Sequence, residues 1–230
     1  MNIFALNFTC ARDEQLADLM SETLLKYSIP YIKQIRSINT DDTKWGNGAG
    51  WGASMMKLAA IDQMLRDYVI HDDDFILSVD SDVVFCTRDV FEVVNPDYGI
   101  WGVQHKPPYD TKYGKFGHMS GALIFLRGDI AKMMVQFSDN ELHRIRMEEF
   151  KGYVIVENED VVLSYLAMVC GAKPMDLPGW LSSGNFEEEL LTGDLKSYYH
   201  LNYCPTTFLD EPVTGKWDIP SVIRSKDIDL

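Results

Sequence analysis

The chain lacks a long apolar run, a paired-cysteine motif and an excess of basic residues. No stretch of about 18 or more apolar residues occurs in its 230 residues, so the sequence predicts no membrane span. The cysteines stand far apart and form no Cys-x-x-Cys pair, which argues against a zinc site and a disulfide framework. We therefore expect buried free thiols in a reducing compartment, and a cytoplasmic protein. The cysteines are Cys10, Cys86, Cys170 and Cys204.

The shortage of basic residues limits the kind of partner. There are 35 acidic residues against 21 basic ones, and the net charge is −14. A phosphate backbone would be repelled, so we expect no nucleic-acid partner. An acidic chain that binds a diphosphate needs a local positive charge, which a bound metal ion supplies.

The overall composition is that of an ordinary globular protein, with 46% hydrophobic and 24% charged residues. The length fits one α/β domain over residues 1–230. Residues 1–8 lack a basic segment and a small-residue cleavage site. We therefore expect them to form a first strand rather than a signal peptide.

The first hundred residues alternate between strand-like and helix-like segments. Apolar spacing predicts strands at residues 2–7, 31–38 and 75–79, and helices at 13–27 and 54–69. A glycine-rich loop at 40–52 carries Trp45 and Trp51, and is either a mobile lid or packed by its own tryptophans. The β-α-β-α-β order predicts a mostly parallel sheet flanked by helices.

The second half of the chain is less regular. We expect strands at residues 98–103, 122–126 and 153–156, and helices at 130–137 and 160–169. Gly171 suits the position that ends the last of these helices. From residue 176 onward, scattered prolines predict an irregular segment.

The motif Asp80-Ser81-Asp82 follows the apolar run at 75–79. Asp-x-Asp also occurs at 72–74 and 227–229, but only the middle copy directly follows a predicted buried strand. Ligands of open α/β sheets bind where strands end at their carboxyl edge. Two carboxylates there can share a hard divalent cation, and that cation can hold a diphosphate.

His200 lies among aromatic residues near the end of the chain. Alone, such a histidine is more often a packed core residue than a ligand. Together with two carboxylates it suits Mn²⁺ or Mg²⁺, and its nitrogen favours Mn²⁺.

Two further segments have both a structural and a functional interpretation. The small residues at 117–122 either form a simple turn or let the backbone approach a ligand closely. Glu159 and Asp160 open a helix, where acidic residues are favoured by the helix dipole. A carboxylate in that position can also act as a base.

Taken in order, these motifs resemble those of GT-A glycosyltransferases, and most of all the glycogenin- and galactinol-synthase-like retaining branch. The resemblance covers nearly the whole chain. It implies a GT-A, Rossmann-like fold with a mixed, mostly parallel central sheet flanked by helices. Residues 1–103 would be the nucleotide-binding half and 104–230 the acceptor-binding half. It also implies transfer of a sugar from a nucleotide-diphosphate sugar, most simply a UDP-sugar, to an acceptor hydroxyl.

The same resemblance assigns roles to particular residues. The implied metal ligands are Asp80, Asp82 and His200, and the implied catalytic residues are Asp160 and Glu159. The implied contacts to the nucleotide sugar are Phe8, Thr9, Lys57, Ser81, Ser120, Gly121 and Lys216. The acceptor is left open as a glycan, a protein or a small molecule.

Two positions depart from the retaining branch. Met119 stands where that branch has an asparagine, and residues 158–160 read Asn-Glu-Asp in place of Asp-Gln-Asp. The second departure resembles inverting GT-A enzymes equally well. The stereochemistry is therefore open, with a preference for retention.

Two other functions stay open at the level of sequence. Asp80-Ser81-Asp82-Val83-Val84 fits the motif of haloacid-dehalogenase-type phosphatases, with Asp80 as nucleophile. That motif normally lies on the first strand, and this hypothesis gives His200 no role. A non-catalytic module that binds nucleotide sugars or carbohydrates is the third hypothesis.

Overall fold

A six-stranded sheet runs through the described part of the chain. The computed structural model describes residues 1–9, 14–35, 49–104, 109–111, 114–116, 119–148, 159–181, 189, 192 and 195–200. The elements are β1 (Ile3–Thr9), α1 (Glu14–Lys26), β2 (Tyr31–Ile35), α2 (Ala49–Asp67), β3 (Phe75–Val79), β4 (Val83–Phe85), α3 (Asp89–Glu92), β5 (Ile100–Gln104), β6 (Tyr109–Thr111), β7 (Gly114–Phe116), β8 (Met119–Arg127), α4 (Gly128–Met134), α5 (Asp139–Glu148), α6 (Glu159–Val169), β9 (Pro174–Asp176), the 3-10 helix η3 (Gly179–Leu181) and β10 (Tyr198–His200).

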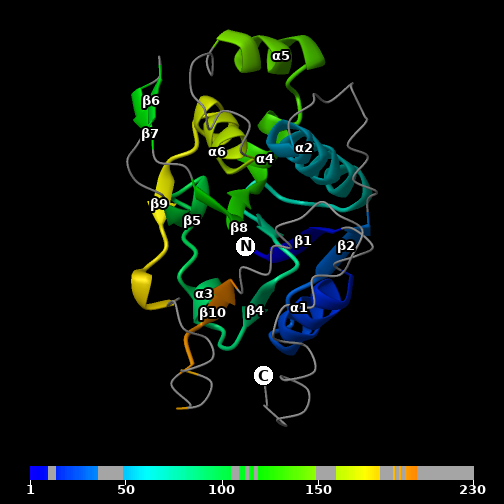
Figure 1. Cartoon of the computed structure of the whole chain (residues 1–230), viewed down its shortest axis with the longest axis vertical. Coiled ribbons are helices and arrows are strands. Elements are labelled where there is room, and N and C mark those ends of the chain that lie inside the picture. Colours follow the sequence, from blue (N-terminus) through cyan, green and yellow to red (C-terminus); the bar gives the residue numbers. More distant parts are fainter. Residues whose placement is uncertain are drawn as a thin grey trace.

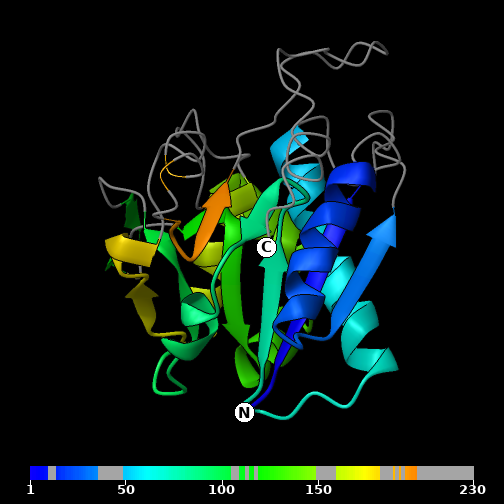
Figure 2. The same ribbon diagram turned by 90° about the horizontal axis from the view of Figure 1, so that it is seen from below.

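The sheet has the strand order β2-β1-β3-β8-β5-β9. Its strands run parallel except β8, which is antiparallel to both of its neighbours, β3 and β5. In Figure 2 the blue arrow of β2 points up and the green arrow of β8 points down, so the two strands run in opposite directions. The start of β8 therefore lies at the edge where β1 and β3 end. The predicted mixed, mostly parallel sheet is confirmed.

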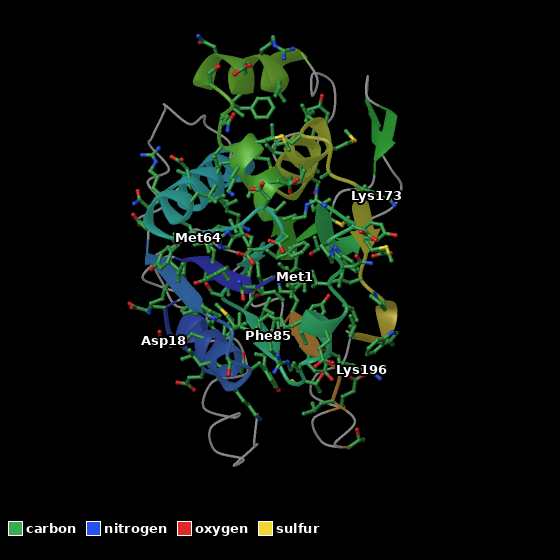
Figure 3. All side chains as sticks on the ribbon, turned by 180° about the vertical axis from the view of Figure 1, so that it is seen from behind. Met1, Asp18, Met64, Phe85, Lys173 and Lys196 are labelled. Carbon is green, nitrogen blue, oxygen red and sulfur yellow. The ribbon has the colours of Figure 1, made fainter. Side chains whose placement is uncertain are left out.

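Helices cover both faces of the sheet, as predicted (Figure 1). Alternate residues of β3 pack into two separate cores because successive strand side chains point to opposite faces. Ile76 packs in a core with α2, α4 and α6, whereas Leu77 packs in a core with α1, α3, β4 and β10. Figure 3 shows Met64 of α2 and Phe85 of β4 on these two opposite sides.

Most of the predicted elements are found, with shifted ends. Gly171 has a φ of +84°, the left-handed conformation that its predicted place after α6 requires. The predicted loop at 40–52 is wrong for residues 49–52, which are helical and begin α2. Glycine costs a helix about 1 kcal/mol relative to alanine, so local propensity argued against a helix start at these residues. The remainder of that loop, with Trp45, and the predicted strand at 153–156 lie outside the described residues.

The prediction of an irregular segment from residue 176 onward is wrong at several of the described residues. Residues Gly179–Leu181 form η3, and Tyr198–His200 form β10. A three-residue strand has no local periodicity, and β10 exists because it pairs with β4. The elements β4, α3, β6, β7, α5 and β9 were not predicted.

The described residues contain no helix with the length and apolar character needed to cross a bilayer. Cys86 and Cys170 are free thiols, but they are half-buried rather than fully buried. Burial raises the pKa of Cys86 to about 12 and that of Cys170 to about 11. Cys10 and Cys204 lie outside the described residues.

Candidate metal centre

The Asp80-Ser81-Asp82 segment is a tight turn between two buried strands. All five residues of β3 and all three of β4 are buried. The turn is fixed by two backbone hydrogen bonds, from Asp80 N to Ala122 O (2.9 Å) and from Val83 N to Asp80 O (3.3 Å). Both carboxylates therefore stand at the carboxyl edge of β3 on a rigid support.

His200 reaches this turn through the pairing of β10 with β4. The two strands are antiparallel, and His200 stands opposite Val83, the residue after Asp82. Its Nε2 atom lies 3.4 Å from Asp82 Oδ1. One ligand atom from each of Asp80, Asp82 and His200 lies within 4.8 Å of the other two. The three predicted metal ligands are thus brought together by two separate segments of the chain.

The three side chains of this cluster are partly exposed to solvent. The Asp82 side chain is 12% exposed, and those of Asp80 and His200 are 31% and 34% exposed. Two carboxylates and an imidazole are ligands that Mn²⁺ accepts, and three protein ligands leave coordination positions open. The donor set therefore fits a divalent cation that shares its shell with a ligand.

Lys57 brings a positive charge to the same place. It lies on α2 and is almost fully buried. Its Nζ atom lies 3.0 Å from Asp80 Oδ1 and donates a longer hydrogen bond of 3.5 Å to Gly121 O. Lys57 therefore joins the Asp80 carboxylate to the start of strand β8, where Ser120 and Gly121 lie.

A buried polar network on β1 supports the middle residue of the turn. Asn7 is fully buried, and its Nδ2 atom donates to Val79 O (2.9 Å) and to Ser81 Oγ (3.3 Å). Ser81 Oγ in turn donates to Thr9 Oγ1 at 2.8 Å. Tyr31 donates a long hydrogen bond to Asn7 Oδ1 (3.4 Å), and burial raises the pKa of this phenol.

Sequence reasoning singled out Thr9 and Ser81 but missed Asn7. The available signal was a polar residue inside the otherwise apolar run of residues 3–8. Phe8 lies beside it in β1, at the carboxyl end of that strand.

The remaining predicted residues are only partly described. Met119 is buried, and its backbone N–H donates to Ser164 Oγ on α6 at 2.9 Å. Glu159 and Asp160 are the first two residues of α6, so the start of β8 is tied to the helix that carries them. Lys216 lies outside the described residues.

Comparison with solved structures identifies the architecture. The chain is similar to a glycosyltransferase involved in the glycosylation of the major capsid of PBCV-1, with a TM-score of 0.56 and 10% identity over 89% of this chain and 94% of that one. The fold is the GT-A glycosyltransferase fold. The predicted GT-A architecture is thereby confirmed, whereas the retaining branch stays a prediction.

Two further structures share the GT-A fold. The glycosyltransferase GlyE of Streptococcus pneumoniae TIGR4 has a TM-score of 0.51 and 13% identity, and the match covers 98% of this chain but 60% of GlyE. An active-site mutant of LgtC has a TM-score of 0.50 and 12% identity, with 87% and 86% of the two chains covered. No protein-family model matches the sequence, and no curated protein sequence matches it.

Proposed function

We propose that this protein is a metal-dependent glycosyltransferase that transfers a sugar from a nucleotide-diphosphate sugar, most simply a UDP-sugar, to an acceptor hydroxyl. The main support for the proposal is that Asp80, Asp82 and His200 lie close together at the carboxyl edge of β3 in a GT-A fold. Ligands of open α/β sheets bind at that edge.

In this proposal Asp80, Asp82 and His200 hold Mn²⁺ or Mg²⁺. The ion, when bound, supplies positive charge to the diphosphate that leaves during transfer. Lys57 adds a second positive charge from the side of α2, because its Nζ atom already lies 3.0 Å from Asp80. Lys216 is proposed as a further phosphate contact on the strength of the sequence resemblance.

The nucleotide is proposed to lie over the ends of β1 and β3. Phe8, Thr9 and Ser81 belong to this edge, and the Thr9 and Ser81 hydroxyls are already hydrogen-bonded to each other. A ribose hydroxyl would therefore meet a pre-formed pair rather than two mobile side chains. Such preorganisation lowers the cost of binding.

The donor sugar is proposed to approach the backbone of Ser120 and Gly121 at the start of β8. Asp160 and Glu159, at the start of α6, are the proposed catalytic pair. In an inverting enzyme Asp160 accepts the acceptor proton, and in a retaining enzyme it orients the substrate. We propose retention, on the sequence resemblance. A cytoplasmic location stays part of the proposal.

The rival phosphatase hypothesis makes Asp80 a nucleophile. The near contact of Lys57 with Asp80 suits that role as well, since a buried lysine can also neutralise a phosphate. His200, however, stands 3.4 Å from Asp82 and has no part in that chemistry. The glycosyltransferase hypothesis uses all of these side chains.

Thermal unfolding in the presence of nucleotide sugars tests the proposal. A ligand that binds the native state raises its apparent stability. We expect a UDP-sugar with Mn²⁺ to raise the melting temperature, and uridine with Mn²⁺ or the UDP-sugar with a chelator to have little effect.

Donor hydrolysis then separates the three hypotheses. A glycosyltransferase releases the nucleotide diphosphate slowly in the presence of metal, whereas a phosphatase cleaves a phosphate monoester such as p-nitrophenyl phosphate. Binding of the nucleotide sugar without any cleavage would favour the non-catalytic module.

A further inference from the structure

The strand β10, which carries His200, is only three residues long. The direction of the His200 side chain therefore depends on which residues of β10 stand opposite which residues of β4. β10 pairs with β4 so that Tyr198, Tyr199 and His200 stand opposite Phe85, Val84 and Val83. Side chains alternate between the two faces of a strand. A slip of one residue would therefore turn the imidazole to the face opposite Asp82.

The aromatic residues of β10 distinguish poorly between these registers. Tyr198 packs beside Phe85, with 6.4 Å between ring centroids, and is buried on one face. Tyr199 is buried on the other face, where its hydroxyl donates to Glu189 and accepts from Lys196 N. After a one-residue slip in either direction, a tyrosine would again fill one of these two places. Hydrophobic burial alone therefore selects the register weakly.

Ser197 distinguishes between the registers through its side-chain hydroxyl, because the backbone carbonyl of any residue in its place could accept the same bonds. Its carbonyl oxygen accepts from Cys86 N (2.8 Å) and Thr87 N (3.2 Å), which extends the ladder beyond β10. Its hydroxyl accepts from Val90 N (2.9 Å), in the first turn of α3, and donates to Thr87 O (3.2 Å). The residue is buried, with 3% of its surface exposed. After a slip, a tyrosine or Lys196 would occupy its place, and neither has a short hydroxyl.

We propose that Ser197 is a positioning residue that fixes the register of β10 against β4 and thereby directs His200 towards Asp82. The residue does not belong to the metal cluster and acts through His200. The inference rests on the proposed metal site. It adds that the geometry of this site is set at the far end of β10, where the strand meets α3.

The test uses the full chain and Mn²⁺ alone, without a donor. Electron paramagnetic resonance reports the Mn²⁺ affinity, and pulsed measurements detect hyperfine coupling to a coordinating ¹⁴N nucleus. His200→Ala gives the reference signal without histidine. Because loss of a supporting contact typically costs metal affinity about 10–100-fold, we expect Ser197→Ala to bind Mn²⁺ about tenfold more weakly and to lose most of the ¹⁴N coupling. Ser197→Thr, which keeps the hydroxyl, should restore both.

Thr23→Val is the matched control. Thr23 is also buried, and its hydroxyl accepts from Phe85 N (3.3 Å) on β4 and donates to Met20 O (2.7 Å). It supports β4 from α1 and makes none of the contacts that hold β10. The variant should retain wild-type Mn²⁺ affinity and ¹⁴N coupling.

The possible results have separate meanings. Unchanged affinity and coupling in Ser197→Ala would overturn the positioning role while leaving the metal site intact. A wild-type protein that binds no Mn²⁺, or binds it without ¹⁴N coupling, would instead refute the proposed metal site. Should Ser197→Ala unfold, Ser197→Cys keeps the side-chain volume with much weaker hydrogen bonding, and the same loss is expected. Unfolding of both variants, with Thr23→Val folded, would assign Ser197 to stability alone and overturn the proposal.

Discussion

The Nζ atom of Lys57 lies 3.0 Å from Asp80 Oδ1, so a candidate metal ligand is already paired with a protein cation. The lysine side chain is 6% exposed, and its charge is therefore weakly screened by water. A metal ion at Asp80 would share that carboxylate with the lysine. The two positive charges would repel each other if the site held metal alone, and a bound diphosphate would offset both.

Replacement of Lys57 by Gln should separate these two effects. We expect Mn²⁺ alone to bind more tightly, because a neighbouring positive charge is removed. Turnover of the donor should fall by about 10²-fold, the usual cost of losing one charge-stabilising group. Mn²⁺ titration and steady-state kinetics measure the two quantities. Lys132→Gln, which removes a more exposed partner of Asp72, is the control. Weaker Mn²⁺ binding in Lys57→Gln would mean that the lysine chiefly holds Asp80 in place.

Replacement of Asp82 by Ala should abolish transfer and most of the Mn²⁺-dependent stabilisation by the donor. The remaining ligands, Asp80 and His200, are too few to hold the ion tightly. Asp72→Ala makes a matched control, because Asp72 belongs to another Asp-x-Asp segment but is 78% exposed. Full activity in Asp82→Ala would refute the metal model.

Replacement of Asp160 by Asn distinguishes the two stereochemical outcomes. In an inverting enzyme the variant loses its base, and transfer should fall by about 10²-fold or more while donor binding is kept. In a retaining enzyme, which we favour, the acceptor KM should rise and kcat should fall. Proton NMR of the first-formed product gives the linkage directly. An inverted product from an α-linked donor would show the preference for retention to be wrong.

Asp74, directly before β3, should contribute to stability in a pH-dependent way. It is 1% exposed and accepts hydrogen bonds from Asn2 N (2.6 Å), Asn2 Nδ2 (3.0 Å) and His71 N (3.0 Å). Burial by itself raises the pKa of this carboxyl, but the hydrogen bonds from His71 and Asn2 outweigh it and hold the pKa below 3.8. The folded state thus favours the ionised form.

Asp74→Asn should therefore lower the free energy of unfolding by about 2 kcal/mol at pH 7. A carboxyl whose pKa is depressed in the folded state stabilises above its unfolded pKa, and this contribution is lost as the pH falls through the folded value. The difference between wild type and variant should accordingly shrink below about pH 4. Denaturant unfolding at several pH values measures it, with the exposed Asp73→Asn as control. A difference independent of pH would exclude the carboxylate as its source.

The first half of the fold could be predicted because most of its helices and strands have a recognisable apolar pattern in their own sequence. The helix α1 has a regular apolar stripe, and β3 is an apolar run bounded by polar residues. Asp80 and Asp82 could be recognised for the same reason, since they follow that run directly. Asp72, in a similar tripeptide before the strand, could be set aside by its position.

The other part of the site depends on pairings between distant segments. His200 was assigned only by resemblance to a family, since its neighbours Tyr198 and Tyr199 suggest a core position equally well. Its approach to Asp82 follows from the β4–β10 pairing, which leaves no local pattern. Ser197 was not predicted for the same reason. A single serine before two tyrosines forms no recognisable sequence pattern.

The β4–β10 pairing also has a consequence for the growing chain. Val90 and Ser197 are hydrogen-bonded although they lie 107 positions apart. At about 5–20 residues per second, roughly ten seconds pass on the ribosome between the emergence of these two segments. During that interval the nascent polypeptide carries two of the three candidate ligands, exposed at the end of an incomplete sheet. The candidate metal centre is therefore completed only after the segment that contains His200 has been translated.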